Sequence, residues 1–176
     1  MPWTAPRAFA ISSRAIAVPS ARPASPASCM RRRTASGTTA NHIGFTLWHY
    51  VRTEDNIVQF ILQDRKPTVW VDGAYHERWG LEKVMQGTGM TTEQAQSMRL
   101  PVIAEWMQYQ QGVWQATEGY LASLDDAGLE RVVKVVPFGE IPVRQALGMV
   151  CLTHGHGHLG EICVLRVLQG LPSSLI

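Results

Sequence analysis

Apolar residues recur at intervals of three and four in three long segments of the chain, covering residues 43–63, 102–124 and 142–168. That spacing gathers the apolar side chains on one face of a helix. In the first segment this face comprises Ile43, Leu47, Tyr50, Val51, Ile57, Val58, Ile61 and Leu62, and it is widened by Trp48 and Phe60. The pattern predicts three long amphipathic helices and therefore an all-α fold.

The third segment contains the string Thr153-His154-Gly155-His156-Gly157-His158-Leu159-Gly160-Glu161, for which two structures compete. On a strand, His154, His156 and His158 would share one face. On a helix, His154 and His158 share a face, while His156 lies roughly 200° around the axis from His154. The apolar spacing on both sides favours one helix of about 27 residues, with Pro142 in its first turn and a stop at residues 170–172.

Shorter elements are expected between these helices. Residues 68–90 are rich in glycine and aromatic residues and are interpreted as a long crossover that covers a pocket, with one helical turn around Leu81–Gln86. Thr91-Thr92-Glu93-Gln94 is typical of a capped start for a short helix ending near Arg99. Residues 125–128 should end the second long helix, and the β-branched residues 131–136 should be extended.

Composition narrows the class of protein. A content of 45% hydrophobic residues is ordinary for a globular domain, and no segment has the 18 to 20 uninterrupted apolar residues of a membrane span. The three cysteines, Cys29, Cys151 and Cys163, lack paired spacing. A disulfide framework is therefore not expected, and we interpret the protein as cytoplasmic, in a reducing compartment.

The net charge of +2 is unevenly distributed. Residues 1–40 hold six arginines and no acid, so residues 41–176 carry a net charge of −4, which does not favour a nucleic-acid partner. Residues 1–40 are also rich in Ala, Pro and Ser without apolar periodicity, which predicts disorder. A solvated extension, non-native coding sequence and a mitochondrial-type transit peptide all remain open as interpretations, with the first two favoured.

Histidine is the commonest side-chain metal ligand, and three histidines are candidates here. His154 and His158 lie one helical turn apart, and His49 flanks the apolar face of the first helix. Competing interpretations exist for each position. His154 and His158 could be two polar residues on a solvated helix face, and His49 could be a packed histidine at the boundary of the core. Helix bundles build metal sites from side chains on facing helices, which favours a shared site. His76 is interpreted as a surface residue.

Two parts of the chain resemble the DinB-like superfamily. Asn41-His42-Ile43-Gly44-Phe45-Thr46-Leu47-Trp48-His49, followed by Arg52-Thr53-Glu54-Asp55-Asn56, looks like that family's second helix. The string from Thr153 to Ile162, with Leu165-Arg166 and Gln169-Gly170-Leu171, looks like its last helix. The resemblance implies a DinB-like four-helix bundle with a long crossover over residues 41–172. The family's first helix has no clear counterpart in residues 1–40, so we expect it to be degraded or absent.

The resemblance also implies a metal site formed by His49, His154 and His158, and a homodimer. Three imidazoles suit a divalent transition metal such as Zn, Ni or Fe and leave coordination positions open. If the three rings share an ion, their ligating nitrogens should converge to about 3–3.5 Å of one another. Glu161, one turn beyond His158, would orient that ring or act as a base. Cys151 is expected to be a packed core residue.

By the same resemblance, the chain would be a metal-dependent enzyme acting on a small-molecule substrate. The activities implied are transfer or isomerisation dependent on a low-molecular-weight thiol such as mycothiol or bacillithiol, or hydrolysis. The alternative is a non-catalytic metal-binding bundle with a structural or sensing role. Neither nucleic acid nor a membrane is an expected partner.

Overall fold

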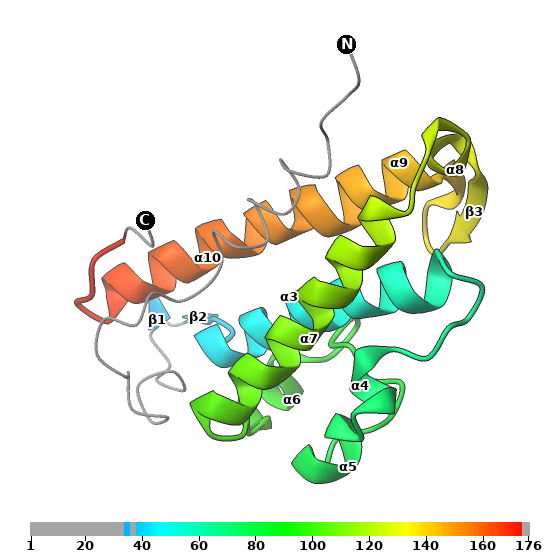
Figure 1. Cartoon of the computed structure of the whole chain (residues 1–176). Helices are drawn as coiled ribbons and strands as arrows, with labels where there is room; N and C mark the ends of the chain where they lie inside the picture. The colour runs from blue at the N-terminus through cyan, green and yellow to red at the C-terminus, as the bar shows by residue number, and fades with distance from the viewer. Residues whose placement is uncertain (1–33, 36–37, 174–176) are drawn as a thin grey trace.

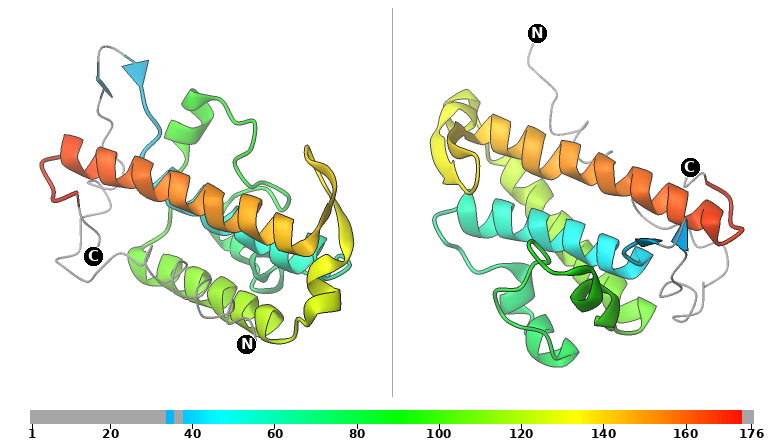
Figure 2. Two further views of the ribbon diagram at one scale, coloured as in Figure 1. Left: turned by 90° about the horizontal axis from the view of Figure 1, so that it is seen from above. Right: turned by 180° about the vertical axis from the view of Figure 1, so that it is seen from behind.

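The computed structural model describes residues 34–35 and 38–173 of the chain. Three long helices form the framework of this range, and Figures 1 and 2 show how they are arranged. The first is formed by α3 (Ile43–Asp55) and a π-helical continuation, η1 (Asn56–Ile61). The second is α7 (Ile103–Ala122). The third runs without a break through α9 (Val143–Ala146), π-helical η2 (Leu147–Thr153) and α10 (His154–Leu168). The predictions of three long helices and of an all-α class are confirmed.

The central helix of the arrangement is α3, which packs against both α7 and α10. His42 begins it, because its ring Nδ1 accepts a hydrogen bond from the Phe45 backbone N–H at 2.9 Å. Almost every residue of α3 is buried, since neighbouring elements cover several of its sides. Phe60, at the end of η1, is 39% exposed, so the prediction that it widens the buried face was wrong.

The crossover between the first two long helices differs from its prediction. Its helical turns are α4 (Val69–Asp72) and α5 (Tyr75–Trp79), followed by α6 (Thr92–Ser97), whereas Leu81–Gln86 contains only turns. Thr68 caps α4, and the buried Asp55 carboxylate accepts from two of its backbone N–H groups. Because that carboxylate comes from α3, local sequence gave no sign of it. The predicted capping box at Thr91 is confirmed.

A short helix and a β-hairpin connect the second and third long helices. The second long helix ends at Ala122, before the stop predicted at residues 125–128, and Asp125 instead caps a further short helix, α8 (Asp126–Glu130). The predicted extended stretch is confirmed as β3 (Val132–Val135), which pairs antiparallel with β4 (Gly139–Pro142). Pro142 ends β4 and forms the N-cap of the last long helix, so its prediction as a first-turn residue was wrong by one position.

Buried apolar side chains form two clusters. An aromatic cluster joins α3 to the crossover, α7 and α10, and contains Trp48, Trp70, Tyr75, Tyr109 and Trp106. A mainly aliphatic cluster lies between η1, η2 and the hairpin, and contains Ile57, Val58, Leu62, Val133, Val135, Val143, Leu147 and Cys151. Cys151 is 1% exposed, as predicted for a core residue.

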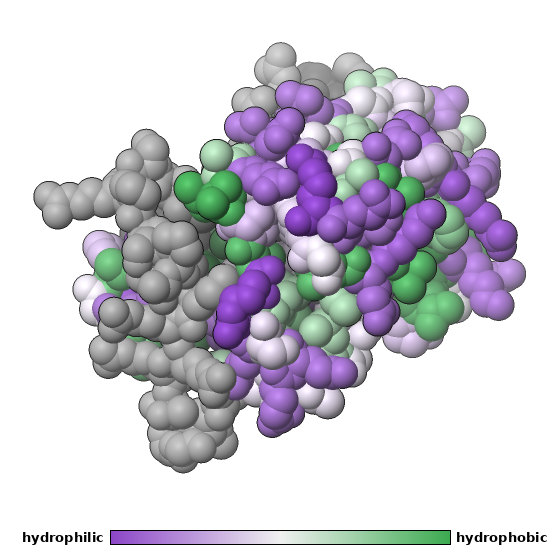
Figure 3. Space-filling model, turned by 90° about the horizontal axis from the view of Figure 1, so that it is seen from below, coloured by the Kyte–Doolittle hydropathy of each residue, from purple (hydrophilic) through white to green (hydrophobic). Residues whose placement is uncertain are grey.

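The prediction of disorder covers residues 1–40, and for residues 1–33, 36 and 37 it falls outside the described residues. The interpretations of that extension and the state of the family's first helix fall outside them as well. Within the N-terminal range, Thr34–Ala35 (β1) and Thr38–Thr39 (β2) pair as two-residue antiparallel strands. Seen from below, the described surface mixes hydrophilic residues with small apolar patches (Figure 3). None of the helices in the described ranges combines the length and apolar character needed to cross a bilayer.

Candidate metal centre

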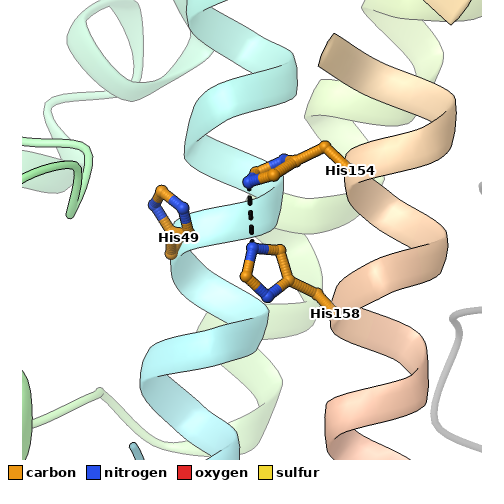
Figure 4. A group of neighbouring side chains, drawn as sticks. All are labelled: His49, His154 and His158. Carbon is orange, nitrogen blue, oxygen red and sulfur yellow. Dashed lines mark hydrogen bonds between the residues drawn. The ribbon is translucent and has the colours of Figure 1, made fainter. Parts of the chain in front are cut away.

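Three imidazole rings from two helices face one another (Figure 4). His49 projects from α3, and His154 and His158 project from consecutive turns of α10. The His49 ring centroid lies 5.1 Å from each of the other two, and the His154 and His158 centroids are 4.4 Å apart. One ring nitrogen from each residue lies within 4.8 Å of the others, a grouping that could hold a metal ion. The helical interpretation of the histidine string is confirmed.

In His49 and His158, a hydrogen bond to the outer ring nitrogen determines which nitrogen the ring presents to the centre of the cluster. His49 Nδ1 lies 2.5 Å from the carbonyl oxygen of Gln86, and His158 Nδ1 lies 2.6 Å from Glu161 Oε2. A carbonyl or carboxylate oxygen only accepts, so each Nδ1 carries the proton and each neutral ring has its lone pair on Nε2. This outer arrangement is the one that orients metal-ligating histidines in proteins.

The closest contact in the cluster is between His154 Nε2 and His158 Nε2, at 2.9 Å. With the lone pair of His158 on that nitrogen, His154 must donate a proton when no cation lies between them. Two nitrogens bound to one ion should be separated by about 3–3.5 Å, so the two rings would move apart by roughly a few tenths of an ångström to admit it. The set of three imidazole donors, all within 4.8 Å of one another, suits a first-row divalent metal.

The surroundings of His49 and His154 favour the neutral form of both rings. Burial, reinforced by the neighbouring His158 and His49, lowers the pKa of His154 to about 4. Burial also lowers the pKa of His49, although the hydrogen bond to the Gln86 carbonyl opposes the shift. Glu161 behaves differently, because its hydrogen bond with His158 lowers the pKa of the carboxyl. At neutral pH the site thus presents uncharged His49 and His154 rings beside the Glu161 carboxylate, and a neutral imidazole is the form that binds a cation.

Gly155 explains how the two helices come close enough for the rings to meet. A Cβ atom at this position would lie 2.5 Å from Tyr50 Cε2, so no larger residue fits without a shift. Tyr50 follows His49 on α3, and Gly155 follows His154 on α10. The close approach of the helices is therefore located beside the ligand positions themselves.

The crossover completes the environment of His49. Gly87 is buried with φ +92°, and a Cβ atom there would lie 2.8 Å from His49 Nδ1. An open cavity of about 750 Å³ is lined by most of residues 79–90, including Gln86 and Gly87, together with Gln94 and residues 97–99. The three histidines do not line this cavity. The crossover does border a cavity, and its last part also holds the ring of one candidate ligand.

The remaining histidines considered from sequence lie apart from this cluster. His156 is exposed on another side of α10, where its Nδ1 lies 2.9 Å from the Leu152 carbonyl oxygen. His76 packs beside Trp70 with only 13% of its side chain exposed, so it is less superficial than predicted. Sequence reasoning also missed Gln86, whose backbone carbonyl contacts His49, and Arg52, whose side-chain Nε donates to the Met85 carbonyl. Two features of the sequence could have indicated these contacts: the Gly87-x-Gly89 pair, which lets the backbone pass close to a side chain, and an arginine one helical turn after His49.

Comparison with known protein families identifies the family of this chain. The model of the DinB superfamily matches residues 13–162, a range that contains His49, His154, His158 and Glu161. It begins within the first 40 residues and extends through most of the last long helix. No curated protein matches the sequence. Because the family match covers far more than half of the 176 residues, the chain belongs to the DinB superfamily.

Proposed function

We propose that the protein is an enzyme dependent on a divalent transition metal held by His49, His154 and His158. The observation that carries this proposal is the convergence of three imidazoles, two of which have their outer nitrogens already hydrogen-bonded. Two of these rings, His49 and His158, have fixed tautomers with Nε2 directed toward the cluster. Zn²⁺, Ni²⁺ and Fe²⁺ suit an all-imidazole donor set, whereas Mg²⁺ and Ca²⁺ prefer oxygen ligands.

Three protein ligands leave coordination positions open, as in catalytic sites more than in structural ones. The chemistry that such an ion supplies is Lewis acidity, which polarises a substrate oxygen and lowers the pKa of a water or thiol bound to it. The side chain of His158 is 20% exposed, so a small molecule can approach the cluster. Glu161, at 2.6 Å from His158 Nδ1, orients that ring, and its lowered pKa makes it a weak base.

The reaction class follows from the resemblance and the open positions together. We favour transfer or isomerisation that uses a low-molecular-weight thiol such as mycothiol or bacillithiol, because an ion in this site would stabilise a thiolate. Hydrolysis by an activated water uses the same ligands. In both cases the chain's own residues hold the three imidazoles in place, and Glu161 keeps the Nε2 atom of His158 directed inward.

The first test measures metal content. Purified protein is stripped of metal, supplied separately with Zn²⁺, Ni²⁺ and Fe²⁺, and analysed by elemental mass spectrometry after removal of free ions. We expect one ion per chain in the wild type and its loss in His49→Ala, His154→Ala and His158→Ala. His156→Ala is the matched control, because His156 lies in the same string but outside the cluster, and it should retain the ion.

The second test separates the enzyme from a non-catalytic bundle. Metal-loaded protein is assayed for thiol transfer to electrophilic small molecules and for hydrolysis, with the metal-free protein and His49→Ala as controls. Turnover that depends on both the metal and His49 supports the enzyme. A retained ion without turnover of any substrate class supports the structural or sensing role. No first-row metal retained by the wild type, and no change on His49→Ala, would overturn the metal site.

A further inference from the structure

A buried arginine lies one helical turn beyond His49. Arg52 is 2% exposed, and burying a guanidinium is costly unless it is paired and hydrogen-bonded. Its charge is matched by Asp55, whose Oδ2 lies 3.5 Å from Arg52 Nη1. The guanidinium carbon also lies 5.4 Å from the centroid of the Trp70 ring, within reach of a cation–π interaction. Arg52 is therefore held in place on several sides.

The crossover is fastened to this arginine near its end. Arg52 Nε donates to the carbonyl oxygen of Met85 at 3.1 Å. The next carbonyl along the chain, that of Gln86, accepts the hydrogen bond from His49 Nδ1. Two consecutive carbonyls of the crossover are thus bound by two side chains of α3 that are three residues apart.

The start of the crossover is fastened to the same group of residues. Asp55 Oδ1 and Oδ2 accept from the backbone N–H groups of Val69 and Trp70, each at 2.9 Å, and Oδ2 also accepts from Tyr109 at 3.1 Å. His49, Arg52 and Asp55 follow one another at intervals of three residues on α3. This row of three side chains holds both ends of a segment whose middle has no long helix.

We infer that Arg52 is a positioning residue for His49. Its hydrogen bond to the Met85 carbonyl fixes the position of the next carbonyl, that of Gln86, beside His49 Nδ1. The Gln86 carbonyl can only accept a hydrogen bond, so Nδ1 carries the proton and the lone pair of the His49 ring lies on Nε2, toward His154 and His158. The effect on metal affinity rests on the proposed function, but the tautomer of His49 is a property of the metal-free protein. Outer partners of metal-ligating histidines typically change metal affinity by about 10–100-fold.

The variants are chosen to separate the grip on Met85 from the loss of charge. Arg52→Met alone would leave the Asp55 carboxylate buried without its cation, so it is combined with Asp55→Asn. Asp55→Asn by itself is the matched control, because it loses the same carboxylate while Arg52 keeps its donor to the Met85 carbonyl. It leaves Arg52 buried without its anion, so urea denaturation first establishes that this variant is folded at pH 7.5. If the double variant does not fold, Arg52→Lys replaces it, since lysine keeps the positive charge and lacks the planar guanidinium fork.

Two measurements are made on each protein. Long-range ¹H–¹⁵N spectra of the metal-free, histidine-labelled protein at pH 7.5 report the His49 tautomer, and absorbance titration with Co²⁺ reports metal affinity. We expect wild type and Asp55→Asn to carry the His49 proton on Nδ1. The double variant, or Arg52→Lys in its place, should show a mixture of tautomers and a Kd for Co²⁺ weaker by about 10–100-fold.

An Nδ1 proton and an unchanged Co²⁺ affinity in the folded Arg52 variant would overturn the inference, as would loss of the tautomer in Asp55→Asn alone. The spectra also separate this inference from the proposed function. If wild type binds no Co²⁺, the metal site fails, while the His49 tautomer still decides whether Arg52 positions that ring.

Discussion

His49 Nδ1 and the carbonyl oxygen of Gln86 are 2.5 Å apart, although 37 residues separate them in the sequence. This contact sets the tautomer of one candidate ligand from outside the two helices that carry the three rings. The backbone must pass close to His49 to make it, and the glycine after Gln86 provides the room. The crossover is therefore part of the candidate metal centre as well as a connection between helices.

Gly87 and Gly89 form a natural pair for testing this contact. Both have positive φ, +92° and +79°, so alanine at either position carries a strain of about 1–2 kcal/mol. Only at Gly87 would the new Cβ meet His49, at 2.8 Å from Nδ1. We expect Gly89→Ala to lower the free energy of unfolding by about that strain alone, and Gly87→Ala to lower it further and weaken Co²⁺ binding. Urea denaturation and Co²⁺ titration measure the two effects, and equal behaviour of the two variants would contradict the contact.

Gly155 and Gly157 form a second pair, on one helix and two residues apart. Alanine favours a helix over glycine by up to about 1 kcal/mol, and the position of Gly157 has nothing within 4 Å of a new Cβ. Gly157→Ala should therefore stabilise the protein slightly. Gly155→Ala should destabilise it by about 1–3 kcal/mol, because the Cβ would push against buried Tyr50 and separate the two helices.

Thermal unfolding followed by circular dichroism measures both glycine variants, and metal titration tests whether separation of the helices weakens the site. Metal binding should fall in Gly155→Ala and stay unchanged in Gly157→Ala. A Gly155→Ala protein as stable as the Gly157→Ala protein would show that a Cβ atom beside Tyr50 does not force the two helices apart.

Glu161→Gln tests the orientation of His158. A glutamine side chain can turn its N–H₂ group toward His158 Nδ1, which then favours the tautomer with the lone pair on the wrong nitrogen. We expect metal affinity to fall by about 10–100-fold with no comparable loss of stability, because Glu161 is 51% exposed. Glu140→Gln, at an exposed position on the hairpin, is the control and should bind metal like wild type. Calorimetric titration with Zn²⁺ compares the three proteins. A Glu161→Gln variant that binds Zn²⁺ as tightly as wild type would show that Glu161 does not orient His158 for metal binding.

Glu54 predicts a dependence of stability on pH. Its fully buried carboxyl accepts hydrogen bonds from Tyr50 and Thr117, yet burial raises its pKa from 4.5 to about 7. The folded protein then binds the Glu54 proton more tightly than the unfolded chain between these two values. This contribution to stability is complete below pH 4.5 and is lost as the pH rises to about 7, by up to roughly 3 kcal/mol.

Glu54→Gln should flatten this part of the pH profile, because glutamine stays neutral and can still bond both hydroxyls. Urea denaturation at intervals from pH 4.5 to pH 8 measures it, with Glu140→Gln as the exposed control. We expect the variant to gain stability relative to wild type as the pH rises. Parallel profiles for Glu54→Gln and wild type would mean that Glu54 is not protonated in the folded protein near neutral pH.

Several local predictions were confirmed because their causes are local. The periodic apolar residues of the three long segments produce helices within one or two residues of the predicted limits, and the Thr91 capping box lies within four residues. The errors have non-local causes. The turns of α4 depend on the Asp55 carboxylate from α3, and β4 depends on pairing with β3 across a turn. In both cases the stabilising partner, the Asp55 carboxylate or strand β3, lies outside the segment that it stabilises, so the sequence of that segment does not reveal it.

The sequence by itself determined that His154 and His158 share a helical face, because a helix brings residues four apart onto the same side. It also provided the Gly155 that permits close packing at that point. Only the tertiary structure decided that His49 faces this pair and that Gln86, Arg52 and Asp55 hold its surroundings. The physical reason is that helical periodicity fixes directions around one axis, whereas the meeting of two helices and a crossover depends on how their buried surfaces pack together.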